Sequence, residues 1–175
     1  MIAPLRRTAL CQGAVEKRIM DGNGMSPREA AMHDRPVQDI VQRTATLRCA
    51  PADLVAMAAH SMAEAGCGSI LVCEGDRLTG IFTERDLLCR VVAKGLDPKK
   101  TTVGQVMTVN PCTIAPEAPI REAIRVMDEG SFRYLPVCRA GKLVAVISAK
   151  DLPYEEIGRM ARALEQEHVI AERLW

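Results

Sequence analysis

The stretch GIFTERD, residues 80–86, places a hydroxyl and a carboxylate three residues apart directly after an apolar run. A Ser or Thr followed three residues later by an acid is a capping box, which satisfies free amides at the start of a helix. The stretch therefore predicts a strand that gives way to a helix at Thr83. A second stretch, AVISAKD (residues 145–151), repeats the arrangement 65 residues later, with Ser148 in place of Thr83.

The same 65-residue offset aligns much of the remaining sequence. Apolar residues with the i, i+3, i+4, i+7 spacing of an amphipathic helix correspond in two sets, Val55, Ala58, Ala59 and Met62 with Ile120, Ala123, Ile124 and Met127. The apolar runs 70–73 and 135–138 correspond as well, and Pro51 and Pro116 each precede a predicted helix. So many matches at one offset indicate a tandem duplication.

Each unit predicts the element order β-α-β-β-α. A short lead-in strand (residues 44–50 and 111–115) passes through a proline turn into the amphipathic helix, and two strands joined by a tight turn follow before the second helix. Neither unit alone covers both faces of so small a sheet, so we expect the two to pack together. The predicted fold class is α/β (α+β), with tandem repeats forming one pseudo-two-fold module, plus a C-terminal helix.

The duplication sets the predicted organisation of the chain. We expect a disordered N-terminal extension over residues 1–35, a first repeat over 36–94, a linker over 95–101 and a second repeat over 102–153. The linker contains Gly95, Pro98 and two lysines, which are typical of a loop. Beyond it, an apolar stripe with helical spacing predicts a C-terminal helix over residues 154–175.

Composition and charge exclude several classes of function. The 175 residues carry a formal net charge of +1 and only 3% aromatic residues, which gives no basis for binding nucleic acid or an anionic membrane surface. No apolar run is long enough to span a membrane. The seven cysteines form no Cys-x-x-Cys pair and no zinc-ligand spacing. We expect most of them to pack as small apolar residues in a cytoplasmic protein.

The hydroxyl-x-x-carboxylate step has two explanations, which the residues alone leave open. As a helix cap it contributes roughly 1 kcal/mol to folding. As a binding site it offers a phosphate free amides and the positive end of a helix dipole. Its aspartate can also accept two hydrogen bonds from the vicinal hydroxyls of a ribose. In that case Gly80 would let the ligand lie close to the backbone.

The tandem unit resembles a known family. The GIFTERD signature, the stretch EGSFRYLPV (residues 129–137) and the repeat itself make residues 36–153 similar to a cystathionine β-synthase-type (CBS) domain pair. The chain looks most like the small stand-alone bacterial proteins of this family. The resemblance implies two clefts between the repeats that bind an adenine nucleotide (AMP, ADP or ATP) as a regulatory ligand. It implies no required cofactor and no metal.

The resemblance also implies which residues bind the nucleotide. Asp86 and Asp151 would bind the ribose, and Thr83 and Ser148 would lie on the phosphate side. Arg133 corresponds to a basic position that often meets phosphate, and Lys150 to one that is cationic in some members. The adenine pocket would be lined by Thr46, Leu47, Thr113 and Ile114. Given the resemblance, we favour phosphate binding for Arg133 over an exposed strand-edge charge, but an ordinary solvated position for Lys150.

The two predicted clefts are not equivalent. The second unit has Ala145 where the family signature has glycine, and the added methyl group narrows its cleft. Pro153 falls in the helix expected after Ser148, where proline removes a backbone hydrogen bond. We therefore expect the cleft that contains Asp86 and Arg133 to be the better binding site.

The resemblance implies a sensor of adenine nucleotides as the leading hypothesis for function. We expect it to be non-catalytic, because no Ser-His-Asp, Cys-His or paired-carboxylate arrangement is evident in the sequence. The alternative is a dimerisation or interaction scaffold whose nucleotide sites are degenerate, and a less favoured third class is an enzyme with a cysteine nucleophile. The expected partners are an adenine nucleotide, a second copy of the chain that packs on the amphipathic helices and the C-terminal helix, and an unidentified protein target.

Overall fold

The structure is a computed structural model of the chain, and it describes residues 35–41 and 46–152. The predicted C-terminal helix and nearly all of the predicted N-terminal extension lie outside these ranges, as does Pro153. The described part contains both repeats, so the predicted architecture can be compared with the structure element by element.

The first repeat has the predicted order of elements. It comprises β1 (Arg48–Cys49), α2 (Val55–Glu64), β2 (Ser69–Glu74), β3 (Arg77–Thr83) and α3 (Glu84–Asp86). Helical structure continues beyond α3 through a π-helical turn, η2 (Leu87–Val91), and a 3-10 turn, η3 (Val92–Lys94). It ends at Gly95, whose φ of 64° is a left-handed conformation that glycine adopts without strain.

The second repeat follows the same plan. Its lead-in is a single parallel bridge between Ile114 and Val137, and it continues with α5 (Ile120–Gly130), β5 (Tyr134–Arg139) and β6 (Lys142–Ser148). All four apolar positions predicted for the helix are buried in α5. Residues 149–151 form a turn, and the described part of the chain ends at residue 152.

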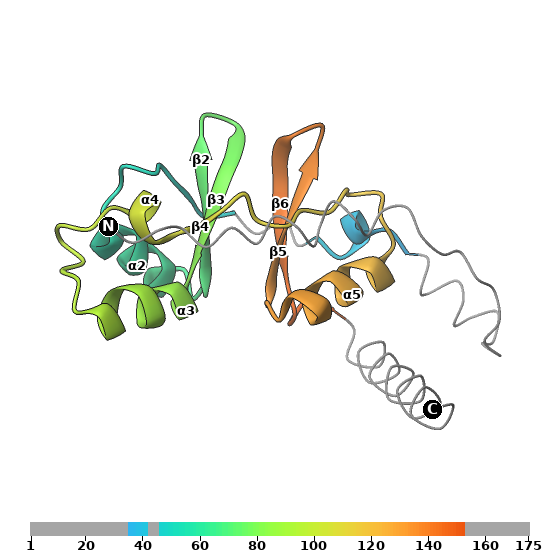
Figure 1. The fold of residues 1–175 in the computed structure, drawn as a ribbon. Coiled ribbons are helices and arrows are strands. Elements are labelled where there is room, and N and C mark those ends of the chain that lie inside the picture. The colour runs from blue at the N-terminus through green and yellow to red at the C-terminus, as the bar shows by residue number, and fades with distance from the viewer. Residues whose placement is uncertain (1–34, 42–45, 153–175) are drawn as a thin grey trace, which may run out of the picture.

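The strands form one six-stranded sheet in the order β1-β2-β3-β6-β5, with β4 (Thr108–Val109) paired to β3. Each repeat contributes an antiparallel hairpin, and both hairpins shift register at corresponding places, between Val72 and Cys73 and between Val137 and Cys138. The hairpins meet at the centre of the molecule with their helices on the outer sides (Figure 1). The matching registers confirm the predicted pseudo-two-fold module.

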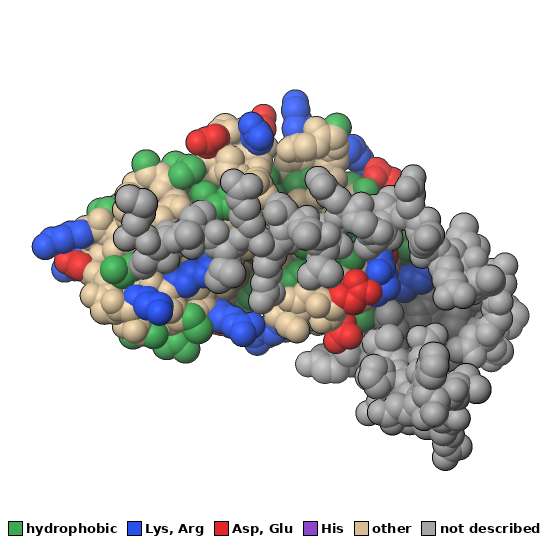
Figure 2. All heavy atoms as spheres, viewed as in Figure 1, with side chains coloured by type: hydrophobic (Ala, Val, Ile, Leu, Met, Phe, Trp, Pro, Cys, Tyr) green, Lys and Arg blue, Asp and Glu red, His purple; other side chains and the backbone are tan. Residues whose placement is uncertain are grey.

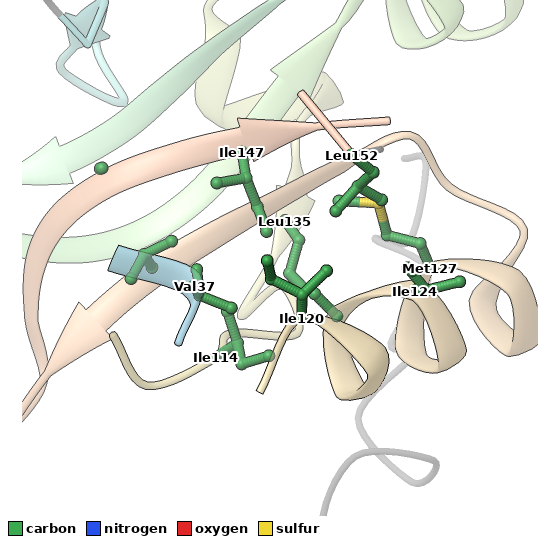
Figure 3. Close-up of a cluster of buried hydrophobic side chains, with 11 residues drawn as sticks. Val37, Ile114, Ile120, Ile124, Met127, Leu135, Ile147 and Leu152 are labelled. Carbon is green, nitrogen blue, oxygen red and sulfur yellow. The ribbon is translucent and has the colours of Figure 1, made fainter. Parts of the chain in front are cut away.

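The opening segments of the two repeats are exchanged between them, which the sequence did not predict. The turn η1 (Val37–Asp39) opens the first repeat but packs on the second, and Figure 3 shows Val37 beside Ile114 and Ile120. Conversely α4 (Val103–Val106), which comes before the hairpin and helix of the second repeat, packs in the core of the first.

Equivalent backbone hydrogen bonds hold both exchanged segments. In one, the amides of Val37 and Gln38 donate to the carbonyls of Ala118 and Pro116 at 2.8 and 2.9 Å, and in the other the amides of Val103 and Gly104 donate to those of Asp53 and Pro51, both at 2.8 Å. The acceptors differ by 65 residues in both cases. The exchange is therefore part of the pseudo-symmetry.

Each repeat has its own apolar core, and a third cluster joins them. The first core is built around Phe82 and includes residues of α2 and α4, and the second is built around Leu135 and Ile147. Leu71, Cys73, Ile81 and Leu143 form the cluster between the hairpins. Each core thus includes a segment that lies outside its own β-α-β-β stretch.

Candidate functional site

A cleft of about 710 Å³ is lined by residues of both repeats. This volume lies in the range of small-molecule sites in proteins. The first repeat contributes the end of β3 and the helical segment after it, and the second contributes α5 and the start of β5. The lining residues include Thr83, Glu84, Arg85, Asp86, Arg90, Asn110, Thr113, Glu122, Arg125, Glu129, Ser131, Arg133 and Tyr134.

Thr83 and Asp86 form the predicted capping box at this cleft. The amide and the hydroxyl of Thr83 donate to Oδ2 of Asp86 at 3.0 and 2.7 Å. The amide of Asp86 donates in return to Oγ1 of Thr83 at 3.3 Å. Asp86 is only 8% exposed. The capping explanation of the motif is therefore confirmed, and the same carboxylate also lines the cleft.

The other oxygen of Asp86 faces a cation that sequence reasoning missed. Nε of Arg90 lies 3.2 Å from Oδ1 of Asp86, and the guanidinium also donates to the carbonyl of Val106 at 2.8 Å. Both charged side chains are largely buried, so this pair is screened less by solvent than an exposed pair would be. Arg90 thus orients the carboxylate and ties the helical segment after α3 to α4.

Two contacts join the repeats across the cleft. Glu84 Oε1 accepts a hydrogen bond from Arg133, which starts the second hairpin. A guanidinium nitrogen of Arg85 lies 3.5 Å from the carbonyl oxygen of Ser131 at the end of α5. Arg133 is exposed, as its position at a strand edge predicts, but it is paired with an acid of the other repeat.

The charges of the lining are balanced. Four arginines (Arg85, Arg90, Arg125 and Arg133) face four acids (Glu84, Asp86, Glu122 and Glu129). Three of the arginines pair with acids inside the lining, including Arg125 with Glu129 at 2.9 Å. An anionic ligand in this cleft would therefore compete with carboxylates for most of its cations.

The structure brings four of the eleven predicted site residues together in this cleft, namely Thr83, Asp86, Thr113 and Arg133. Gly80 is not in the lining. A Cβ atom at Gly80 would collide with Sδ of Met107 and lie 3.1 Å from the carbonyl oxygen of Thr108. The glycine therefore allows the close approach of β4 to β3.

The other predicted site residues lie outside this lining. Ser148 and Asp151 form the second cap, in which the Ser148 amide and hydroxyl donate to Oδ2 of Asp151 at 2.6 and 2.8 Å. Ile114 is buried in the second core, Leu47 packs against the first, Thr46 is half-buried and Lys150 is exposed. The cleft with Asp86 and Arg133, which the sequence favoured, is the one described here.

Sequence reasoning missed most of the charged residues in the lining. Arg85 could have been found, because the 65-residue offset places it opposite Lys150, which had been considered for phosphate binding. Arg90 lies four residues after Asp86, a spacing that brings oppositely charged side chains together on a helix, so it too could have been found. Glu84 gave no such signal, since its partner lies in the other repeat. Its contribution depends on how the repeats pack.

The cysteines only partly follow the packing prediction. Cys73 is buried and Cys49, Cys67 and Cys138 are half-buried, but Cys89 is exposed and lines the cleft. Cys112, which also lines it, is disulfide-bonded. Burial, reinforced by Asp53 and Cys73, raises the pKa of the Cys49 thiol to about 12. Among the described residues there is no group of three or more potential metal ligands.

No helix within the described ranges is long and apolar enough to cross a membrane. Figure 2 shows acidic and basic side chains along the same face, separated by apolar and neutral surface. The mixture agrees with the near-zero net charge of the sequence.

Comparison with known proteins gives consistent matches. The CBS domain family matches residues 37–93 and 103–153. The CBS domain-containing protein CBSCBSPB2 of Arabidopsis thaliana is 39% identical over 102 residues, which are 56% of this chain and 19% of that protein. The chain thus spans about a fifth of the length of this relative.

Solved structures share the fold. A CBS-domain protein from Burkholderia ambifaria is 35% identical, with a TM-score of 0.63 over 67% of this chain and 90% of its own. A CBS domain protein from Pyrobaculum aerophilum, complexed with AMP, is 22% identical, with a TM-score of 0.64 over 69% and 92%. A hexameric CBS-CP12 protein from bloom-forming cyanobacteria is 27% identical, with a TM-score of 0.62 over 69% and 67%.

The two matched ranges coincide with the two structural repeats and together cover more than half of the chain. This chain therefore belongs to the CBS domain family, as a tandem CBS pair.

Proposed function

We propose that the chain is a non-catalytic regulatory module that binds an adenine nucleotide in the cleft between its repeats. One observation carries the proposal: Thr83, Asp86, Thr113 and Arg133 come from different elements of two repeats and line a single cleft of nucleotide-compatible volume. The AMP complex of the Pyrobaculum aerophilum protein, which shares the fold, supports the choice of ligand class.

The residues of the cleft have distinct roles in this proposal. Asp86 Oδ2 is occupied by the cap, so Oδ1, which faces Arg90, is the oxygen that accepts from the ribose hydroxyls. Arg133 and Arg85 are the exposed cations for the phosphates. Thr113 belongs to the second repeat and also lines the cleft, and in this proposal it contacts the base.

Calorimetric titration with adenosine, AMP, ADP and ATP tests this proposal. Asp86→Asn removes a charged acceptor and should weaken binding of all four ligands about tenfold or more. Arg133→Ala should weaken the nucleotides but spare adenosine, which has no phosphate. Arg139→Ala is the matched control, because Arg139 is an equally exposed arginine that pairs with Glu117 outside the lining.

Urea unfolding of each variant separates lost binding from lost folding. The proposal of nucleotide binding in this cleft is wrong if no ligand binds the wild-type chain. It is also wrong if Arg133→Ala and Arg139→Ala change the affinity for AMP equally. In that case the scaffold should replace the sensor as the function.

The scaffold is a second candidate because of one surface observation. Met57, Leu88 and Val92, all on helical segments of the first repeat, are each at least 60% exposed. Exposed large apolar residues on neighbouring elements are typical of interaction surfaces. The hexamer of the cyanobacterial relative supports association through this fold. The proposed assembly is a homodimer, with a further protein target that reads its state.

Light scattering at micromolar concentration measures the assembly directly. We expect a dimer for the wild-type chain and a monomer for Leu88→Asp, which places a charge in the apolar surface. A monomeric wild-type chain would contradict this part of the proposal and leave nucleotide binding untouched.

A further inference from the structure

Glu84 is paired with Arg133, the residue that the proposed function assigns to the phosphates. Its carboxylate pairs with Arg133 across the cleft, so an acid of the first repeat is bound to an arginine of the second. The two side chains are 54% and 65% exposed, which leaves the pair accessible to a solute. A ligand phosphate that reaches Arg133 must therefore displace a carboxylate already in place.

The surroundings of Glu84 hold its carboxylate in this position. The Glu84 amide donates to the carbonyl of Gly68 at 3.0 Å, which fixes the start of α3 against the turn before β2. A Cβ atom at Gly68 would lie 3.0 Å from Oε2 of Glu84 and would collide with the hydroxyl of Tyr134. The carboxylate thus lies between the backbone of Gly68, the Tyr134 ring and Arg133.

The pKa of the Tyr134 hydroxyl reflects how close Glu84 and Arg133 lie to it. Burial raises the pKa of its hydroxyl, and the negative charge of Glu84 raises it further, whereas Arg133 acts in the opposite direction. The three side chains therefore form one group at the rim of the cleft, in which Glu84 supplies the negative charge.

We propose that Glu84 is a specificity-determining residue of this cleft: it occupies Arg133 in place of the ligand anion and penalises any phosphate that binds there. This inference rests on the proposed nucleotide function and specifies how that site discriminates. Nucleotides compete with Glu84 for Arg133, while an uncharged nucleoside leaves the pair intact. The native cleft therefore binds phosphorylated ligands more weakly than its arginines alone would allow.

The second repeat has no ion pair at the equivalent position. The 65-residue offset places Ala149 opposite Glu84 and Gly68 opposite Arg133. The backbone is the same, since the Ala149 amide donates to the carbonyl of Arg133 at 2.8 Å as the Glu84 amide donates to that of Gly68. The second repeat therefore has the equivalent backbone but neither charged side chain. The Glu84–Arg133 pair has no counterpart at that position of the second repeat.

The test is Glu84→Gln, which keeps the shape of the side chain and removes its charge. Glu117→Gln is the matched control. Its carboxylate also pairs with an exposed arginine, Arg139, both side chains being 60% exposed, and it lies outside the lining. Both variants change the net charge equally, so a general effect of charge on anion binding appears in both.

Titrations with adenosine, AMP and ATP in magnesium-free buffer measure the effect. We expect Glu84→Gln to bind AMP and ATP about two- to fivefold more tightly than wild type, the range that the energy of an exposed ion pair allows. Adenosine affinity should be unchanged in both variants, and Glu117→Gln should match wild type for all three ligands.

The outcomes distinguish the inference from the function on which it rests. If wild type binds AMP and Glu84→Gln binds it equally or more weakly, the role of Glu84 is wrong and nucleotide binding stands. A gain that Glu117→Gln reproduces also overturns it, because the effect is then general charge. If neither wild type nor Glu84→Gln binds any of the three ligands, the proposed function fails, and the inference fails with it.

Discussion

Repeat 1 carries Glu84 directly after its capping hydroxyl, whereas repeat 2 carries Ala149 at the same place on an equivalent backbone. The hairpin registers and the buried helix faces agree between the repeats, and in both a hydroxyl and its own amide donate to the aspartate three residues later. The Asp86 amide donates back to the Thr83 hydroxyl, whereas the Asp151 amide donates to the Ser148 carbonyl. Among the positions that differ, Glu84 and Ala149 lie beside the two capping hydroxyls. The duplicated fold thus keeps its apolar pattern and its two hydroxyl–aspartate pairs, while the charges around them differ.

The largest expected difference concerns the two capping aspartates. Asp86→Asn should lower the free energy of unfolding by about 2–3 kcal/mol, because it weakens the cap and leaves the largely buried Arg90 without its acid. Asp151→Asn should lower it by only about 1 kcal/mol, the usual value of a cap. Urea unfolding of both variants measures this. Equal losses would show that the Asp86–Arg90 ion pair contributes no stability beyond that of the cap.

The exchanged segments should respond alike. Val37 and Val103 are fully buried, each in the core of the repeat that does not follow it directly. Val37→Ala and Val103→Ala should each cost about 2 kcal/mol, the loss expected for two buried methyl groups.

Hydrogen exchange locates the damage in these two variants. Val37→Ala should speed exchange in β5 and β6 more than in β2 and β3, and Val103→Ala should do the reverse. If Val37→Ala instead loosened the first hairpin, the exchange of segments would be wrong.

Gly80 should be sensitive to an added methyl group for a structural reason. Gly80→Ala should lower stability by about 1–2 kcal/mol, because the new Cβ presses on Met107 and on the backbone of β4. In a Met107→Ala background the additional cost should shrink, since the flexible side chain no longer occupies the space. Nucleotide affinity should hardly change. A loss of nucleotide affinity with stability retained would instead support the predicted role of Gly80 in binding.

The smallest expected difference is a pH effect at Cys49, which corresponds to Ile114 in the second repeat. Folding raises the pKa of this thiol to about 12. The unfolded chain therefore loses the proton first, and the resulting stability is present below pH ~9 and lost as the pH rises towards 12.

Unfolding by urea at several alkaline pH values measures this effect. Stability of wild type should fall faster above pH 9 than that of Cys49→Val, by less than about 1.4 kcal/mol per pH unit, because the thiol keeps some contact with solvent. Parallel curves would assign the alkaline loss to other groups, such as Cys73 and Cys138, whose pKa values burial also raises.

Periodicity and the constant offset were sufficient to predict α2, α5 and both hairpins, because these elements depend on local apolar spacing and turn residues. The two caps followed from a three-residue spacing that is itself local. The convergence of Asp86 and Arg133 on one cleft came from the family resemblance, which carries tertiary information that spacing lacks.

The exchange of η1 and α4 could not be predicted from the repeat. An offset shows that two segments are equivalent but not which copy each one packs against. The pairing of Glu84 with Arg133 has the same origin, since it depends on the angle at which the repeats meet. Such contacts between distant charged residues leave no periodic signal.

The exchange of η1 and α4 also determines when each core can close during synthesis. The first core needs Val103, Val106 and Met107, so it stays open when its own hairpin has left the ribosome. Val37, by contrast, is synthesised before the rest of the second core, which can close once Leu152 has been synthesised. At about 5–20 residues per second, the 45 residues between Met107 and Leu152 take roughly 2–9 s. We therefore expect the two halves to become protected from proteolysis within seconds of each other, although one is made well before the other.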